Sequence, residues 1–170
     1  MPAGVRGECA IYLQHWTLQM RTPKMRQRLD FYKASPSAMR PLIALEAEVS
    51  KLGIDPVLLD LVKLRASQIN GCAYCVDLHA TDLRKKGESE RKIVAVAVWR
   101  ETPFFSDRER AALAWTEALT LLPQSQAPDT DYDVLSRHFN DRERVDLTLS
   151  IGIINVWNRL AVGFRKAPVA

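Results

Sequence analysis

The sequence predicts an all-α fold, and three observations lead to that prediction. Apolar residues recur at helical spacing through much of residues 35–164. Capping residues, prolines and glycines interrupt this pattern where helices would begin and end. The sequence contains no pair of alternating stretches joined by hairpin turn residues, and no internal repeat. A chain of 170 residues suits a single domain, which the pattern divides into about six to seven helices.

Two helices are predicted before the cysteine-containing segment. Ser35-Pro36-Ser37 is a helix start signal, and the apolar stripe that follows it stops at Gly53. Asp55-Pro56 opens the second helix, which ends at Asn70-Gly71. Both helices therefore have a recognisable first and last residue in the sequence itself.

The next two predicted helices follow without a long loop. One runs from about Cys72 to Lys86 and closes at Gly87, with three basic residues in its last turn, where cations are favoured. Ser89 caps the other, which carries apolar residues as far as Trp99, and Thr102-Pro103 ends it.

Three more helices complete the domain. Ser106 and Glu109 form a capping box that opens a helix stopped by Pro123, and a polar loop of residues 124–130 follows. A short helix is expected over residues 132–139. The final helix, over residues 140–164, is apolar around much of its circumference. We therefore expect it at the centre of the fold or at a subunit interface.

The composition is typical of an ordered globular protein, with 47% hydrophobic and 26% charged residues. No apolar stretch approaches the roughly 20 residues needed to cross a bilayer, so we expect no membrane segment. The net charge of +4 comes from the start of the chain, because residues 1–40 hold seven basic and two acidic residues, whereas residues 41–170 hold seventeen and eighteen. This distribution argues against nucleic-acid binding, which needs a basic face on the folded body.

Residues 1–24 are expected to form a flexible N-terminal extension, and residues 25–170 the helical domain. The extension has no helical or strand period, and polar residues interrupt its apolar ones, unlike the apolar region of a secretory signal. We therefore expect a cytoplasmic protein, whose thiols are kept reduced. Its cysteines then do not indicate a structural disulfide framework, and Cys9 in the extension has no evident partner.

The segment Asn70-Gly71-Cys72-Ala73-Tyr74-Cys75, followed by His79, indicates chemistry. On a helix, Cys72, Cys75 and His79 project within about 60° of arc. Cys72 stands at the helix start, where unpaired N–H groups and the macrodipole favour a thiolate. His79 lies one turn after Cys75, where it is placed to accept or return a proton. Two thiols able to form a disulfide beside a base are the minimum equipment for dithiol redox chemistry.

Three other interpretations of the cysteine pair remain open. The two cysteines and His79 offer three zinc ligands, but the chain has no second CxxC pair, and only His15 and His138 remain as further histidines. A thioredoxin-type motif requires a βαβ context, which the pattern lacks. The cysteines also fit two buried apolar residues at a helix start, without a chemical role.

The residues around this pair resemble those of a known family. Residues 61–75 (LVKLRASQINGCAYC), followed by His79, are similar to the core of the alkylhydroperoxidase D (AhpD)-like proteins of the carboxymuconolactone decarboxylase superfamily. Residues 32–36 (YKASP), 99–103 (WRETP) and 155–161 (NVWNRLA) resemble segments of its peroxidase-related branch. The resemblance extends from about Phe31 to Arg165 and leaves out residues 1–24.

The resemblance implies a role for each matched residue. Cys75 would attack the peroxide O–O bond and become a sulfenic acid, which Cys72 would resolve to a disulfide. His79 would deprotonate the attacking thiol, and Asp60, twelve residues before Cys72, would complete the proton relay. The family usually has glutamate there. Because aspartate is one methylene shorter than glutamate, a hydrogen bond from this position to the relay is lost unless a water bridges the gap or the helix shifts. The alternative is that Asp60 is a solvated acid in the first turn of its helix.

The expected function is therefore a thiol-dependent peroxidase of antioxidant defence. It would reduce a hydroperoxide and be regenerated by a dithiol protein, either lipoylated or thioredoxin-like. The resemblance also implies a homo-oligomer, a trimer or hexamer, built through helix packing. No metal, haem, flavin or nucleotide cofactor is expected. Two other classes stay open: a carboxymuconolactone decarboxylase-like enzyme, although those relatives lack the paired cysteines, and a non-enzymatic redox-sensing protein.

Other conspicuous residues are expected to be structural. Aromatic side chains on apolar helical faces are expected in core or subunit packing: Tyr74, Trp99, Trp115 and Trp157. His138 is expected to be a surface or structural histidine. Three polar residues share one side of the last helix, either near the active site, at an interface, or as buried groups with backbone partners: Asn155, Asn158 and Arg159.

Overall fold

The computed structural model describes residues 26–168, so Cys9 and the predicted extension lie outside the described residues. Within that range the chain forms nine α-helices and one 3-10 helix and no strand, which confirms the all-α prediction. The elements are α2 (Phe31–Ala34), α3 (Pro36–Val49), α4 (Pro56–Ile69), α5 (Ala73–Lys85), α6 (Glu90–Ala95), η1 (Val96–Glu101), α7 (Asp107–Thr120), α8 (Leu122–Ser125), α9 (Asp129–His138) and α10 (Asp141–Gly163). The count exceeds the six to seven predicted helices mainly because α2 and α8 are single four-residue turns.

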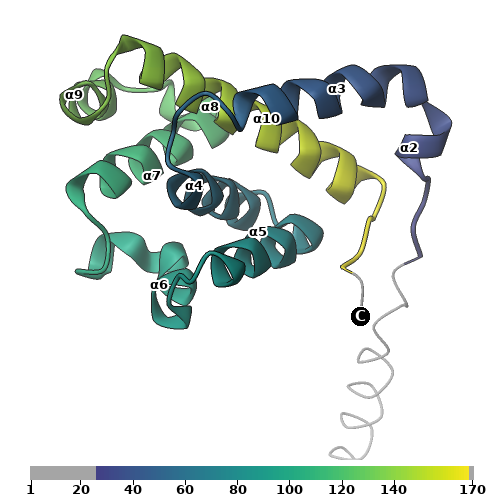
Figure 1. Cartoon of the computed structure of the whole chain (residues 1–170), viewed down its shortest axis with the longest axis horizontal. Coiled ribbons are helices and arrows are strands. Elements are labelled where there is room, and N and C mark those ends of the chain that lie inside the picture. Colours follow the sequence, from purple (N-terminus) through teal and green to yellow (C-terminus); the bar gives the residue numbers. More distant parts are fainter. Residues whose placement is uncertain (1–25, 169–170) are drawn as a thin grey trace, which may run out of the picture.

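Helix α4 lies at the centre of the bundle, with α5, α7, η1 and α10 packed around it (Figure 1). Its residues 58–64 are all buried, because neighbouring helices cover every side of it. Helix α10 packs against α3, α4, α5, α7 and α9. One stripe of α10 stays exposed, and it contains Val145, Leu149 and Val156.

Side-chain caps start the main helices where the sequence predicts them. The Asp55 carboxylate accepts hydrogen bonds from the N–H groups of Val57 and Leu58, both at 2.9 Å, ahead of α4. Ser106 and Glu109 form the predicted capping box of α7. Asn140 and Glu143 form a second capping box at the start of α10. These helix starts are determined by local chemistry.

Three predicted boundaries are wrong. The helix expected to reach Trp99 changes after Ala95 into the 3-10 helix η1, and Val98 within η1 departs from helical geometry (φ −128°, ψ 33°). Helix α7 ends at Thr120, and Pro123 lies in the first turn of α8, where proline is tolerated. Helix α9 begins at Asp129 and not at residue 132, with two acidic residues in its first turn, where they are favoured.

A buried amide network joins the end of α4 to α10. The Asn70 amide donates to Asn155 Oδ1 at 3.0 Å and to Asn158 Oδ1 at 2.9 Å. Asn158 donates to Ser67 Oγ at 3.0 Å, and Asn155 donates to Thr120 Oγ1 at 3.2 Å. Side-chain partners therefore satisfy much of this network. It holds the chain in place directly before the cysteine pair.

Half-buried Glu117 joins α4, η1 and α7. It accepts hydrogen bonds from Arg65 Nε and Trp99 Nε1, both at 2.8 Å, and from Arg100. Burial raises the pKa of Glu117, but the hydrogen bonds from Arg100, Trp99 and Arg65 outweigh that effect, so its pKa lies below the usual value. A carboxyl group with a lowered pKa stabilises the fold above the unfolded-state pKa, and this contribution is lost as the pH falls through the folded-state pKa.

Glu117→Gln is expected to lower the free energy of unfolding by about 2 kcal/mol at pH 7, because Arg65 and Arg100 lose their charged acceptor. The difference from wild type should shrink as the pH falls below the unfolded-state pKa and through the lowered folded-state pKa of Glu117, because the wild-type carboxylate is then protonated as well. Urea unfolding at several pH values measures this. Glu90→Gln, in an exposed pair with Arg84, is the matched control and should change stability little. A constant difference at all pH values would contradict the prediction.

None of the helices within residues 26–168 has the length and apolar character needed to span a membrane.

Candidate active site

The cysteine pair lies at the start of α5. Gly71 adopts a φ of +65°, in the left-handed region that suits glycine, and this turns the chain from the end of α4 into α5. Cys72 is the N-cap residue, and its sulfur accepts a hydrogen bond from the Cys75 N–H at 3.3 Å. The Cα atoms of the two cysteines are 5.4 Å apart and their sulfurs are bonded to each other. Both side chains are buried.

His79 and Asp60 form a buried pair beside the cysteines. His79 lies one helical turn after Cys75 on α5, and Asp60 faces it from α4. The distance from His79 Nδ1 to Asp60 Oδ1 is 3.3 Å. Because an ionised carboxylate only accepts hydrogen bonds, Nδ1 carries the proton, and Nε2 is left as the proton acceptor of the ring. The shorter side chain of aspartate therefore still reaches the histidine in this fold.

Lys86 holds the second oxygen of the same carboxylate. Its ammonium group contacts Asp60 Oδ2 and also donates to the Pro56 carbonyl at 3.0 Å. Burial raises the pKa of Asp60, but hydrogen bonds from His79 and Lys86 and their charges outweigh this, so the pKa lies below its usual value. Asp60 is therefore ionised at neutral pH, with one oxygen on the imidazole and the other on a lysine.

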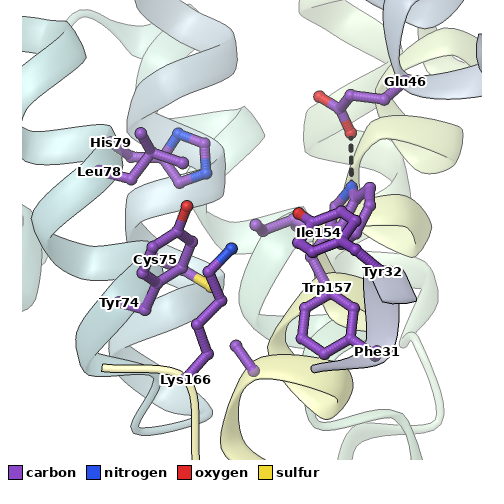
Figure 2. A pocket seen from close by; sticks show the side chains of 11 residues that line it. Phe31, Tyr32, Glu46, Tyr74, Cys75, Leu78, His79, Ile154, Trp157 and Lys166 are labelled. Atoms are coloured by element: carbon purple, nitrogen blue, oxygen red, sulfur yellow. Dashed lines mark hydrogen bonds between the residues drawn. The ribbon is translucent and has the colours of Figure 1, made fainter. Parts of the chain in front are cut away.

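A cavity of about 190 Å³ opens onto Cys75 and His79 (Figure 2). Its walls come from α2, α3, α5, α10 and the segment after α10. Apart from these two residues, it is lined by Phe31, Tyr32, Glu46, Tyr74, Leu78, Ile154, Trp157, Ala161 and Lys166. Cys72 does not line this cavity and borders a separate depression next to Gly71 and Ala73. The two sulfurs therefore differ in what they face, and Cys75 is the one that a ligand in the cavity would meet.

Glu46 adds an ion pair to the cavity wall. Its carboxylate contacts Lys63 of α4 through one oxygen and accepts a hydrogen bond from Trp157 Nε1 at 3.2 Å through the other. The sequence does not indicate Glu46 as a site residue, because nothing in its local pattern distinguishes it from a solvated acid on α3. Its partners lie 17 and 111 positions away. Only the packing of three helices brings them together.

Two of the four predicted site residues, Cys75 and His79, line the cavity. Asp60 contacts His79 from α4, and Cys72 is bonded to Cys75. Of the aromatic residues expected in packing, Trp99 and Trp115 are buried in the core. Tyr74 and Trp157 contribute to the cavity wall as well, which sequence analysis did not predict.

The other conspicuous polar residues do not line this cavity. Asn155 and Asn158 are buried groups in the amide network, and Arg159 donates to the Asn155 carbonyl at 2.8 Å. The partners of the two asparagines are largely side chains rather than the expected backbone groups. His138 ends α9, and its carbonyl accepts a hydrogen bond from Arg108.

Three potential metal ligands lie within 4.8 Å of one another: one atom each of Asp60, His79 and Asp82. Lysines of the chain already contact both carboxylates, since Lys86 contacts Asp60 and Lys85 Nζ lies 3.3 Å from Asp82 Oδ1. This arrangement suits a charge network better than a metal site. The zinc interpretation with the two cysteines would require their sulfurs, bonded to each other here, to be reduced.

Comparison with known proteins identifies a family model that matches residues 36–118, and its description is carboxymuconolactone decarboxylase family. The matched segment extends from α3 into α7 and contains all four predicted site residues.

Individual relatives and a solved structure are also similar to this chain. The uncharacterized protein YdfG of Bacillus subtilis (strain 168) is 38% identical over 138 residues, which cover 81% of this chain and 94% of YdfG. Alkyl hydroperoxide reductase AhpD of Solibacter usitatus is 39% identical over 64 residues, which cover 38% of this chain and 33% of that protein. The crystal structure of ATU0492 from Agrobacterium tumefaciens, a protein of unknown function provisionally assigned to antioxidant defence as AhpD, is 46% identical. The match covers 85% of this chain and 100% of that one, with a TM-score of 0.83.

Proposed function

Because the chain belongs to the carboxymuconolactone decarboxylase family as an AhpD-like member, we propose that it is a thiol-dependent peroxidase that reduces organic hydroperoxides. One observation carries the proposal. A cysteine pair close enough to form a disulfide has one member, Cys75, at a cavity that His79 also lines. Such a pair gives up two electrons to a substrate as it forms a disulfide, without a metal or an organic cofactor.

The oxidative half of the cycle takes place at Cys75. His79 Nε2 accepts the thiol proton, and the Asp60 carboxylate stabilises the resulting imidazolium through Nδ1–H. The Cys75 thiolate attacks the distal oxygen of ROOH, the O–O bond breaks, and the RO⁻ leaving group takes a proton to become ROH. Cys75 is now a sulfenic acid. The Cys72 thiol then attacks the Cys75 sulfur, so that the disulfide forms and water leaves.

The reductive half of the cycle requires an external dithiol. Exchange with a lipoylated or thioredoxin-like protein passes two electrons to the disulfide, restores both thiols and leaves the donor as a disulfide. A cytoplasmic setting, where thiols are kept reduced, is part of this proposal.

A thiol count tests the proposal. The full chain contains three cysteines, so treatment of the reduced protein with one equivalent of cumene hydroperoxide should remove two of three thiols. Added dithiothreitol or dihydrolipoamide should restore them and support continued hydroperoxide consumption. A redox sensor would be oxidised once and then stop, and a protein with a purely structural pair would lose no thiols. Either outcome would contradict the proposal.

We also propose that copies of the chain assemble through the exposed stripe of α10. Val145, Leu149, Gly152 and Val156 are spaced by four, three and four residues and are all exposed, so they share one face of the helix. A second copy packed on this face would bury apolar side chains that now contact solvent. Light scattering of the full chain should therefore give a mass that is a multiple of 19.2 kDa, and a monomer would contradict this.

A further inference from the structure

Lys166 lies at the cavity that contains Cys75, inside a group of aromatic rings. Its ammonium nitrogen is 4.2 Å from the centre of the Tyr74 ring, 4.6 Å from that of Tyr32 and 5.5 Å from that of Phe31. Figure 2 shows it between the wall that carries Tyr74 and Cys75 and the wall that carries Tyr32 and Trp157. The rings hold the cation by its attraction to their faces and leave N–H donors for another group.

The backbone after α10 is shaped to bring Lys166 back to the cavity. Arg165 has a φ of +56°, an uncommon conformation for a residue other than glycine. The Lys166 N–H donates to the Ala161 carbonyl at 2.8 Å and the Arg165 N–H to the Val162 carbonyl at 3.2 Å. This is the hydrogen-bond pattern of a Schellman cap, which reverses the chain direction. Strained backbone of this kind is often found at ligand sites.

The charge of Lys166 is the one that the cavity leaves without a counter-charge. The other charged side chain on its wall, Glu46, is paired with Lys63. Within residues 26–168, no carboxylate forms a salt bridge with Lys166, and its ammonium contacts only rings. The hydroxyl groups of Tyr32 and Tyr74 likewise form no hydrogen bond within this range and are available as donors. A half-buried cation and two phenols at an otherwise apolar cavity form a binding site for an anionic group.

We propose that the cavity selects compact, apolar hydroperoxides that carry a carboxylate, with the carboxylate bound by Lys166 and the peroxide at Cys75. This inference rests on the proposed peroxidase function and names its substrate class. The aromatic walls contact the apolar body of such a molecule. The cavity, at about 190 Å³, lies below the roughly 300–1,000 Å³ typical of sites for drug-sized ligands, which favours a small substrate.

The test compares cumene hydroperoxide with its para- and meta-carboxylated analogues. The rate constant for loss of thiols from the reduced full chain should be about tenfold higher for the better carboxylated analogue, the size expected for a charge-assisted hydrogen bond. Lys166→Met should remove this preference, so that this variant reacts no faster with the carboxylated analogues than with cumene hydroperoxide, whereas Lys166→Arg should retain the preference. Lys51→Met is the matched control. It removes the same charge from an exposed side chain and should keep the preference.

Two outcomes of the rate comparison would overturn the proposal. The first is equal rates for neutral and carboxylated hydroperoxides in the wild type. The second is an equal fall for both in Lys166→Met, which would mean that Lys166 acts on the Cys75 thiol and not on the substrate.

A binding measurement keeps this proposal separate from the peroxidase proposal. The reduced protein is titrated with 4-isopropylbenzoate and with its neutral isostere 4-isopropylbenzamide, using calorimetry. Tighter binding of the carboxylate than of the amide, abolished in Lys166→Met, would support the anion site. This result would stand even if no hydroperoxide oxidises the thiols, and only the peroxidase function would then fail. Equal affinity for the two compounds would overturn the anion site, even if the thiols react.

Discussion

Cys75→Ser is expected to lower the rate of hydroperoxide consumption at least about 1,000-fold, because a serine hydroxyl is a far weaker nucleophile at neutral pH than a thiolate. Peroxide consumption with dithiothreitol as reductant measures this loss. The variant should keep the wild-type helical content and thermal midpoint of the reduced protein, because serine has nearly the same size and Cys72 Sγ, not Cys75 Sγ, caps α5. Fully retained consumption would contradict the assignment of Cys75.

Cys72→Ser separates the two cysteine roles. Cys75 still meets the hydroperoxide in this variant, but residues 26–168 then hold no other thiol to resolve the sulfenic acid. We expect one turnover, followed by accumulation of a sulfenic acid that dimedone labels at Cys75 and that mass spectrometry locates. If Cys75→Ser accumulates a sulfenic acid at Cys72 instead, the roles are reversed. That outcome would be surprising, because Cys72 does not line the cavity.

Asp60→Asn is expected to lower the rate constant of Cys75 oxidation by about 10- to 100-fold at pH 7, because the imidazole loses the anion that orients it and stabilises its protonated form. The measurement is a pH–rate profile of thiol loss. In wild type the lowered pKa of Asp60 keeps the carboxylate ionised well into the acid range, so its stabilisation of the protonated His79 imidazole should persist as the pH falls from 7 to 5. In Asp60→Asn this stabilisation is lost and thiolate formation is unassisted, so the rate should fall more steeply with decreasing pH than in wild type.

Two further variants sharpen this experiment. Lys86→Met removes the cation from the second oxygen of Asp60 and should shift the profile in the same direction by a smaller amount. Lys85→Met, whose partner Asp82 is on the same helix, is the matched control. Asp60→Glu should give no gain in rate, because the shorter side chain already contacts His79. An unchanged profile for Asp60→Asn at every pH would remove Asp60 from the mechanism.

The helices and the cysteine motif could be predicted because their signals are local. Asp55, Ser106 and Asn140 cap helices through contacts within three residues, so their roles are visible in the sequence. Cys72, Cys75 and His79 lie on one helix, and helical geometry alone places them on one face. The prediction of one helix up to Trp99 is wrong, because neither the change from α6 to η1 nor the non-helical geometry of Val98 has a signal in the local pattern.

The contact between Asp60 and His79 could not be decided from the sequence. The distance between them depends on how closely α4 and α5 pack, and the loss of one methylene changes the reach of the side chain by an amount comparable to the tolerance of a hydrogen bond. In the fold the two helices lie close enough for a distance of 3.3 Å. Lys86, at the other end of α5, then holds the second oxygen.

The all-α class, the main helix starts and the two thiols and base on one helical face each depend on residues within a few positions of one another, so the amino-acid order is enough to predict them. Which sulfur faces a cavity, and what the opposite wall contains, depends instead on how distant helices pack. That wall combines Tyr32, Glu46, Trp157 and Lys166, which are far apart in the chain and meet only when α2, α3 and α10 pack together. Burial and close packing create the cavity and place at its edge the charge of Lys166, which has no counter-charge within residues 26–168, and no local pattern encodes either feature.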